Sequence, residues 1–175
     1  GGNDPLIVME DADIEEAATL AAAGSYKNSG QRCTAVKRML VHESVADQFT
    51  ELLLEKTLAL KYGDPMDESM DMGTVIDEAA AKHFEAVVNE AIAQGARLLA
   101  GNVRVGALYS PTVLDRVDPE MRVVRQETFG PVSPIIRFGS IDEAIRISSG
   151  TAYGLSSAVW TSRRDYITRF VREWH

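Results

Sequence analysis

Short apolar runs typical of β-strands alternate along this chain with longer segments whose apolar residues recur at helical spacing. A helix pattern follows Asp13, a strand pattern covers residues 38–41, and helices and strands continue to alternate toward the C-terminus. Strands separated by helices of this length favour βαβ units, because a parallel strand needs a crossover connection. We therefore expect an α/β fold with a mostly parallel, open sheet flanked by helices.

Residues that are common at helix ends predict where the helices begin and end. Asp13, Ser44 and Ser140 are expected N-caps, because their side chains accept a hydrogen bond from the first helical turn. Another helix is expected from about Asp77, ending at Gly95, where a left-handed C-cap favours glycine. Further strands are expected at residues 97–100, 109–114, 132–138 and 155–160, followed by a last helix from about residue 162. Since Pro134 lacks an N–H, strand 132–138 should lie at an edge or an irregularity.

Composition excludes several classes of function. The chain has 18 Lys plus Arg against 26 Asp plus Glu, a net charge of −8, which argues against binding the phosphate backbone of nucleic acid. No apolar run approaches the roughly 20 residues of a membrane span. The single cysteine cannot form an internal disulfide, which suits a cytoplasmic protein. His42, His83 and His175 lack metal-ligand spacing, so we expect no metal site.

The one cysteine stands in a segment that suggests chemistry. Cys33 follows the turn sequence Asn28-Ser29-Gly30, lies beside Arg32, and precedes a predicted strand. A nearby cation and the free N–H groups of a tight turn both stabilise a thiolate. The alternative is that Cys33 is a small buried hydrophobic residue, and spacing alone does not exclude it.

Several motifs resemble the aldehyde dehydrogenase superfamily over essentially the whole chain. Gly30-Gln31-Arg32-Cys33, after an aromatic-x-Asn stretch, is similar to the family's Gly-Gln-x-Cys signature. The sequence Glu-Thr-Phe-Gly-Pro at 127–131 is similar to its Glu-x-Phe-Gly-Pro motif. Pro-Thr-Val at 111–113 and Tyr-Gly-Leu-Ser at 153–156 are also typical.

The resemblance implies roles for particular residues. Cys33 would be the nucleophile that attacks an aldehyde, forming a thiohemiacetal and then a thioester. Glu127 would hold the nicotinamide ribose of NAD or NADP, and Phe129 would pack near the nicotinamide. The resemblance also implies a homo-oligomer for the full-length protein. Without it, Glu127 and Phe129 could simply be a turn at a helix end and a core aromatic.

Arg32 is the position that bears on the substrate. Arginine directly before the cysteine resembles the phosphonoacetaldehyde dehydrogenase and non-phosphorylating glyceraldehyde-3-phosphate dehydrogenase groups. This resemblance implies that Arg32 binds a phosphonate or phosphate group, for which a guanidinium fork is suited. Three alternatives remain: Arg32 only activates the thiol or pairs with a carboxylate; it holds the carboxylate of a semialdehyde; or the chain is a non-catalytic structural or oligomerisation module.

Some parts of the family pattern have no counterpart in the chain. Of the Glu-Leu-Gly-Gly motif, whose Glu is the general base, only Gly1-Gly2 is present. The cofactor domain, with its oxyanion-hole Asn, and the C-terminal Pro-Phe-Gly-Gly motif have no match. We therefore expect residues 1–175 to be a partial catalytic domain that is inactive alone. Gly1-Gly2 could be an expression scar, although the match of residues 3–8 argues otherwise.

Overall fold

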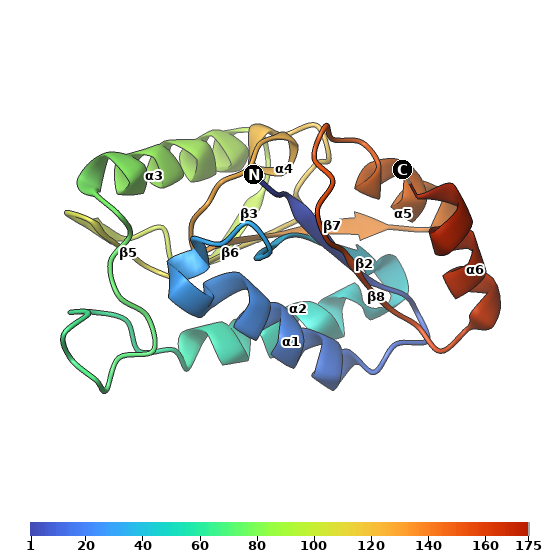
Figure 1. Cartoon of the computed structure of the whole chain (residues 1–175), viewed down its shortest axis with the longest axis horizontal. Coiled ribbons are helices and arrows are strands. Elements are labelled where there is room, and N and C mark those ends of the chain that lie inside the picture. The colour runs from blue at the N-terminus through green and yellow to red at the C-terminus, as the bar shows by residue number, and fades with distance from the viewer. Residues whose placement is uncertain (175) are drawn as a thin grey trace.

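A six-stranded sheet forms the centre of the fold in this computed structural model, which describes residues 1–174 (Figure 1). The strand order is β3-β6-β7-β2-β1-β8, and only the β3–β6 pair is antiparallel. The expected mostly parallel α/β fold is confirmed. The strands are β1 (Asp4–Val8), β2 (Val36–His42), β3 (Arg97–Ala100), β4 (Arg104–Val105), β5 (Leu108–Tyr109), β6 (Thr112–Asp115), β7 (Val132–Phe138) and β8 (Ala158–Trp160).

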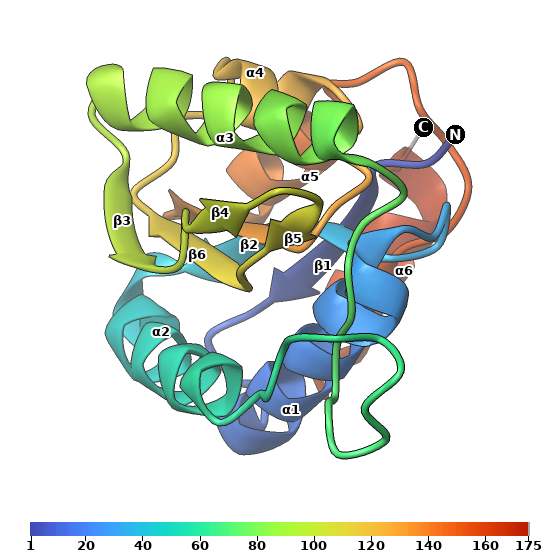
Figure 2. The same cartoon turned by 90° about the vertical axis from the view of Figure 1, so that its left-hand side faces the viewer.

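Helices cover both faces of this sheet. In Figure 1, α1 and α2 lie below the sheet and α3, α4 and α5 lie above it, while Figure 2 shows the small β4–β5 ribbon between α3 and the main sheet. No helix within residues 1–174 is long and apolar enough to cross a membrane. The helices are α1 (Ile14–Tyr26), a 3-10 turn (Lys27–Gly30), α2 (Glu43–Leu58), α3 (Glu78–Ala93), α4 (Arg122–Arg125), α5 (Ile141–Ser148) and α6 (Arg164–Glu173).

The alternation of side chains along each strand divides the core into two layers. In β2, Met39 and Val41 pack with α1 and α2, whereas Leu40 packs into the layer formed by α3, α4 and α5. In β1, Leu6 and Ile7 likewise point to opposite layers. Since both faces are covered, these strands read as continuous apolar runs and not as an alternating pattern.

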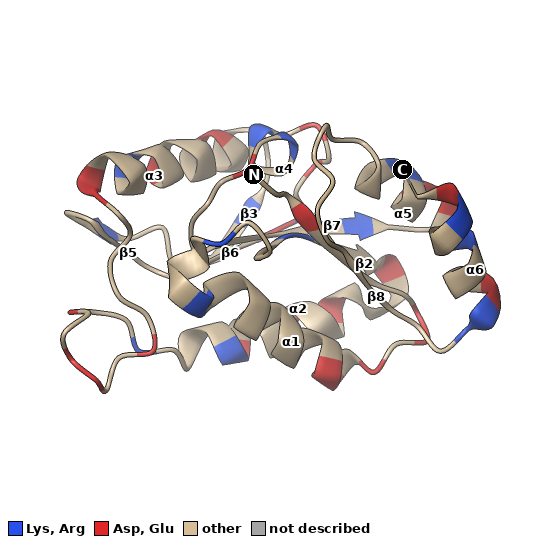
Figure 3. Cartoon of the chain, in the orientation of Figure 1, with Lys and Arg blue, Asp and Glu red and all other residues tan. Residues whose placement is uncertain are grey.

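Most of the expected helix ends are observed. Asp13 accepts from the Glu16 N–H at 3.0 Å, Asp77 from the Ala80 N–H at 2.7 Å, and Ser140 from the Glu143 N–H at 3.3 Å. Charged residues of both signs are distributed along the helices on both sides of the sheet (Figure 3).

The expected cap at Ser44 is wrong. Helix α2 begins at Glu43, and its N-cap is His42, whose Nδ1 accepts from the Ser44 N–H at 3.2 Å. The Ser44 hydroxyl instead lies 2.8 Å from the same nitrogen. An imidazole acceptor at the end of β2 thus takes the role that we assigned to a hydroxyl two residues later.

Three strand predictions needed correction. Strand β7 is not at an edge, because it lies between β6 and β2. Pro134 is tolerated there because the pairing changes at this point: β6 pairs with residues 132–134, and β2 pairs from Ile135 onward. The expected strand 109–114 is divided by Ser110-Pro111 into β5 and β6. The expected strand 155–160 is shortened to β8.

Strand β1 was not expected, yet it lies inside the sheet between β2 and β8. All five of its residues, Asp4–Val8, are buried. Its register with β2 shifts between Asp4 and Pro5, which accommodates the proline. This strand brings the first residues of the chain to the end of the sheet where Cys33 lies.

Candidate active site

Cys33 lies in a turn whose backbone is unusual. Asn28, Ser29 and Gly30 have φ values of 56°, 55° and 71°, so three consecutive residues adopt the left-handed region at the end of α1. Cys33 follows in the turn before β2, and its side chain is exposed. The alternative that Cys33 is a buried hydrophobic residue is therefore wrong.

The loop after α4 carries the other expected site residues. Glu127 is partly buried, and its Oε1 accepts from the Gly2 N–H at 3.0 Å. Phe129 has φ 52° and is 39% exposed, so it is not a core aromatic. The Glu127 N–H donates to the Tyr153 hydroxyl at 3.3 Å, which ties this loop to residues 153–156.

The Cys33 turn and the Glu127 loop touch directly, although they are far apart in sequence. A Cβ added to Gly30 would lie 2.2 Å from the Gly130 carbonyl oxygen and 3.0 Å from the Pro131 nitrogen. Gln31 connects the Cys33 turn to a third segment, the residues before α3, because its Oε1 accepts from the Ile76 N–H at 2.8 Å. The structure therefore places the turn that carries Cys33 against the loop that carries Glu127 and Phe129.

Gly1 and Gly2 complete this contact. A Cβ on Gly1 would lie 2.1 Å from Glu127 Oε2, and one on Gly2 would lie 2.0 Å from the Cys33 carbonyl oxygen. The pair therefore fits between the nucleophile turn and the Glu127 carboxylate, where larger residues would not. Such packing favours Gly1-Gly2 as part of the fold over an expression scar.

Arg32 is directed away from solvent. Its Nη2 donates to the Gly24 carbonyl oxygen in the last turn of α1 at 2.9 Å. Its Nε is buried and has no hydrogen-bond partner within the described residues. No carboxylate among residues 1–174 forms an ion pair with Arg32 within 4.0 Å. The guanidinium therefore has unused donors close to Cys33.

Sequence reasoning missed Lys37, which lies in β2 just beyond the turn. Only 3% of this residue is exposed, and its Nζ donates to the Gly30 carbonyl oxygen. Nζ also lies 5.6 Å from the centroid of the Phe129 ring. Burial lowers the pKa of Lys37 to about 8, an effect that the negative charge of Glu127 partly opposes. The available signal was a lysine within an apolar strand.

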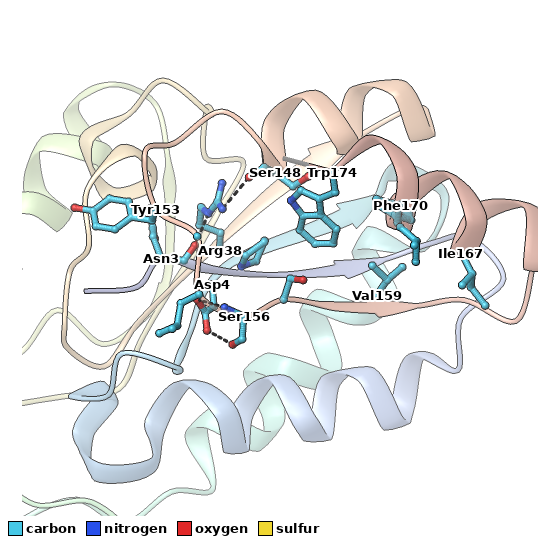
Figure 4. A pocket seen from close by; sticks show the side chains of 15 residues that line it. Asn3, Asp4, Arg38, Ser148, Tyr153, Ser156, Val159, Ile167, Phe170 and Trp174 are labelled. Carbon is cyan, nitrogen blue, oxygen red and sulfur yellow. Dashed lines mark hydrogen bonds between the residues drawn. The ribbon is translucent and has the colours of Figure 1, made fainter.

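A cavity of about 620 Å³ lies elsewhere, and its lining does not include Cys33, Glu127 or Phe129. Figure 4 shows Arg38 at one side of it and the α6 residues Ile167 and Phe170 at the other. Arg38 is almost fully buried and donates to the carbonyls of Asn3, Ile147 and Ser148 at 2.8 to 3.1 Å. This arrangement uses Arg38 to join β1, β2 and α5.

Among residues 1–174, no three His, Cys, Asp or Glu side chains gather as a metal site requires. His175, one of the three histidines considered for a metal, lies outside the described residues. A thiol, a carboxylate and an exposed aromatic ring brought together at one end of a parallel sheet suit covalent chemistry beside a bound cofactor.

The amino-acid sequence is similar to several named dehydrogenases. Sulfoacetaldehyde dehydrogenase from Neptuniibacter caesariensis is 44% identical over 161 residues, covering 92% of this chain and 35% of that protein. Succinate-semialdehyde dehydrogenase [NADP(+)] from Mycobacterium avium is 38% identical, covering 98% of the chain and 37% of its own length. The chain thus spans little more than a third of these relatives.

Solved structures show the same fold. The NADP-dependent glyceraldehyde-3-phosphate dehydrogenase of Bacillus halodurans C-125, complexed with NADP, superposes with a TM-score of 0.95 at 43% identity. The alignment covers 99% of this chain and 36% of that one. The aldehyde dehydrogenase family profile matches residues 1–175. The chain therefore belongs to the aldehyde dehydrogenase family.

Proposed function

We propose that residues 1–175 are part of the catalytic domain of an NAD(P)-dependent aldehyde dehydrogenase, with Cys33 as the nucleophile. The observation that supports this most directly is the contact between the exposed Cys33 turn and the loop bearing Glu127 and Phe129. An oligomerisation module with no chemistry would not need an exposed thiol beside a carboxylate and a half-exposed ring.

In the proposed reaction, the Cys33 thiolate attacks the aldehyde carbon, and the carbonyl oxygen becomes the oxyanion of a thiohemiacetal. The Cys33 backbone N–H would donate one hydrogen bond to that oxygen. A bound nicotinamide would supply the hydride acceptor for the oxidation of this carbon, and Cys33 would then hold the acyl group as a thioester. Water then hydrolyses the thioester, releasing the carboxylate and the free thiol.

The residues present suit such a cofactor. Glu127 is partly exposed, and a carboxylate accepts hydrogen bonds from neighbouring hydroxyl groups such as those of a ribose. Phe129 exposes part of its ring, against which a flat heterocycle can pack. NAD and NADP both meet these requirements. We propose that the 175 residues alone do not sustain turnover, because a dinucleotide site and a general base need further residues.

For the substrate, we propose an aldehyde with an anionic tail, such as a phosphonate or a phosphate, bound by Arg32. Arg32 forms no ion pair with a carboxylate among residues 1–174, so its positive charge is not neutralised and can attract an anionic group. Relatives named for sulfoacetaldehyde and glyceraldehyde-3-phosphate support an oxyanion. The relative named for succinate semialdehyde keeps a carboxylate as the second candidate.

Alkylation of Cys33 tests the nucleophile. Iodoacetamide should label the chain at neutral pH faster than a free thiol with a pKa of about 8.5, with Cys33→Ser as the unreactive control. A rate equal to that of glutathione would rule out an activated nucleophile.

Arg32→Ala tests the substrate in a full-length protein that contains this chain. Losing a charge-assisted hydrogen bond costs about 1.5–3 kcal/mol, so kcat/KM for phosphonoacetaldehyde should fall roughly ten- to a hundredfold. Activity on propanal should hardly change. Arg32→Lys keeps the charge without the fork, and a partial loss confined to the anionic substrate would indicate bidentate binding. Equal losses on both aldehydes would contradict the assignment.

A further inference from the structure

Lys37 places a buried ammonium group against the backbone of the turn that carries Cys33. The residue is 3% exposed, and its Nζ donates to the carbonyl of Gly30, three residues before Cys33. Within residues 1–174 it forms no ion pair shorter than 4.0 Å with a carboxylate. Burying an ammonium group without a directly bonded carboxylate costs free energy. The groups around Lys37 therefore indicate the function of its charge.

The charged groups around Lys37 belong to three different segments. Glu127 interacts with it from the loop after α4, Asp4 from β1, and Cys33 and Arg32 from the turn before β2. The Phe129 ring, 5.6 Å from Nζ, provides an aromatic neighbour. Lys37 therefore lies where three segments meet: the turn that carries Cys33, the loop that carries Glu127 and Phe129, and β1. One of its electrostatic partners is the Cys33 thiol.

Arg32 is adjacent to Cys33 in sequence but is held differently. Its Nη2 is bonded to the Gly24 carbonyl oxygen, so the guanidinium lies back against the end of α1. Lys37, by contrast, is bonded to the backbone of the turn that carries Cys33. The two cations therefore suit different roles. Arg32 keeps donors for a ligand, whereas Lys37 is bonded to the turn that carries Cys33.

We propose that Lys37, and not Arg32, is the positioning residue that fixes the Cys33 turn and supplies the positive charge that favours the Cys33 thiolate. This inference rests on the proposed function, because it assigns a role toward the nucleophile of that reaction. Lys37 itself touches neither substrate nor cofactor.

The protonation of Lys37 gives the proposal a pH signature. Burial lowers the pKa of Lys37 to about 8, with Arg32 lowering it further and Glu127, Asp4 and Cys33 raising it. At pH 7 the ammonium is charged and available to the thiolate. Above about pH 8 it loses its proton, so its influence on Cys33 should disappear at alkaline pH.

The test is iodoacetamide labelling of Cys33 in the 175-residue chain between pH 6 and pH 10. Lys37→Met removes both the charge and the donor to Gly30, whereas Lys37→Gln removes the charge and keeps a donor. Lys37→Arg keeps the charge. Lys27→Met, an exposed lysine from the same turn, is the control for net charge. Circular dichroism and unfolding midpoints establish that each variant is folded.

We expect both neutral variants to label more slowly at pH 7, with the labelling curve displaced to higher pH. The expected decrease at pH 7 is roughly threefold, because a thiol without a nearby cation reacts more slowly. The difference should vanish by pH 10. Lys37→Arg should largely restore the rate, and Lys27→Met should match the unmodified chain.

Two results would overturn the inference while leaving the nucleophile intact. In the first, Lys37→Met and Lys37→Gln label as fast as the unmodified chain at pH 7. In the second, Arg32→Met lowers the rate and the Lys37 variants do not. If the unmodified chain itself labels no faster than glutathione, the proposed nucleophile fails, and this inference fails with it.

Discussion

Replacing Gly30 by alanine should destabilise the fold well beyond the usual cost of losing a glycine. Gly30 has φ 71°, and placing a Cβ in this left-handed region costs about 1–2 kcal/mol. The new Cβ would also lie 2.2 Å from the Gly130 carbonyl oxygen and 2.5 Å from its carbon. Both are backbone atoms, so the segment at Gly130-Pro131 would have to move.

That movement disturbs hydrogen bonds that hold the segment Gly130-Pro131 against the sheet. The Thr112 N–H donates to the Pro131 carbonyl, and the Val132 N–H donates to the Gly130 carbonyl, each at 2.9 Å. At about 0.5–1.5 kcal/mol for each bond, the total for Gly30→Ala is about 3 kcal/mol. For a chain of this length, that lowers the melting temperature by roughly 6–12 °C.

Gly106→Ala is the matched control. Gly106 has a similar φ of 59°, but a Cβ there would meet nothing within 4 Å. It should therefore incur only the conformational cost of about 1–2 kcal/mol. Thermal and urea unfolding of the two variants, measured side by side, provide the comparison. Equal losses of stability would refute the argument that the Cys33 turn and the Gly130 loop are packed backbone against backbone.

Two further predictions concern buried polar groups. Burial raises the pKa of Tyr26 to about 12, so its contribution to stability is fully present below pH 10 and is lost as the pH rises from about 10 through 12. Tyr26→Phe should remove this part of the pH dependence of urea unfolding, and an unchanged profile would contradict it. Asp115 accepts from Arg137 at 2.8 and 3.2 Å, and Asp115→Asn should cost about 2 kcal/mol by leaving a largely buried guanidinium poorly paired. Asp47→Asn, on the exposed partner of Arg137, should change the unfolding midpoint far less.

Local chemistry made the helices predictable, and long-range pairing limited the prediction of strands. Asp13, Asp77 and Ser140 cap their helices through hydrogen bonds to the N–H group three residues later, and this spacing can be recognised in the sequence. Strand β1 was missed because its apolar run is short, and because its pairing with β2 and with β8, more than a hundred residues away, is not visible in the local sequence. For Pro134, only the edge alternative was wrong, because the proline lies at an irregularity where the strand changes pairing partners.

The candidate site divides in the same way. The turn around Cys33 was visible as Asn-Ser-Gly beside a lone thiol, whereas Glu127 and Phe129 came only from the family resemblance. Nothing in their spacing predicts that Gly30 touches Gly130. Lys37 escaped notice because lysine is read as a surface residue, and only the folded structure shows that it is 3% exposed.

The placement of β1 has a consequence for how the chain folds. β1, α1 and β2 form a unit that is local in sequence. Two hydrogen bonds near the candidate site join residues far apart in sequence: the Gly2 N–H donates to Glu127, 125 residues away, and the Ser156 N–H donates to Asp4, 152 residues away. Closing a loop four times longer than that of a local unit costs about 1.2 kcal/mol more in chain entropy. During refolding, the turn with Cys33 should therefore form before its partners arrive, so the thiol acquires its final surroundings in one of the slowest steps.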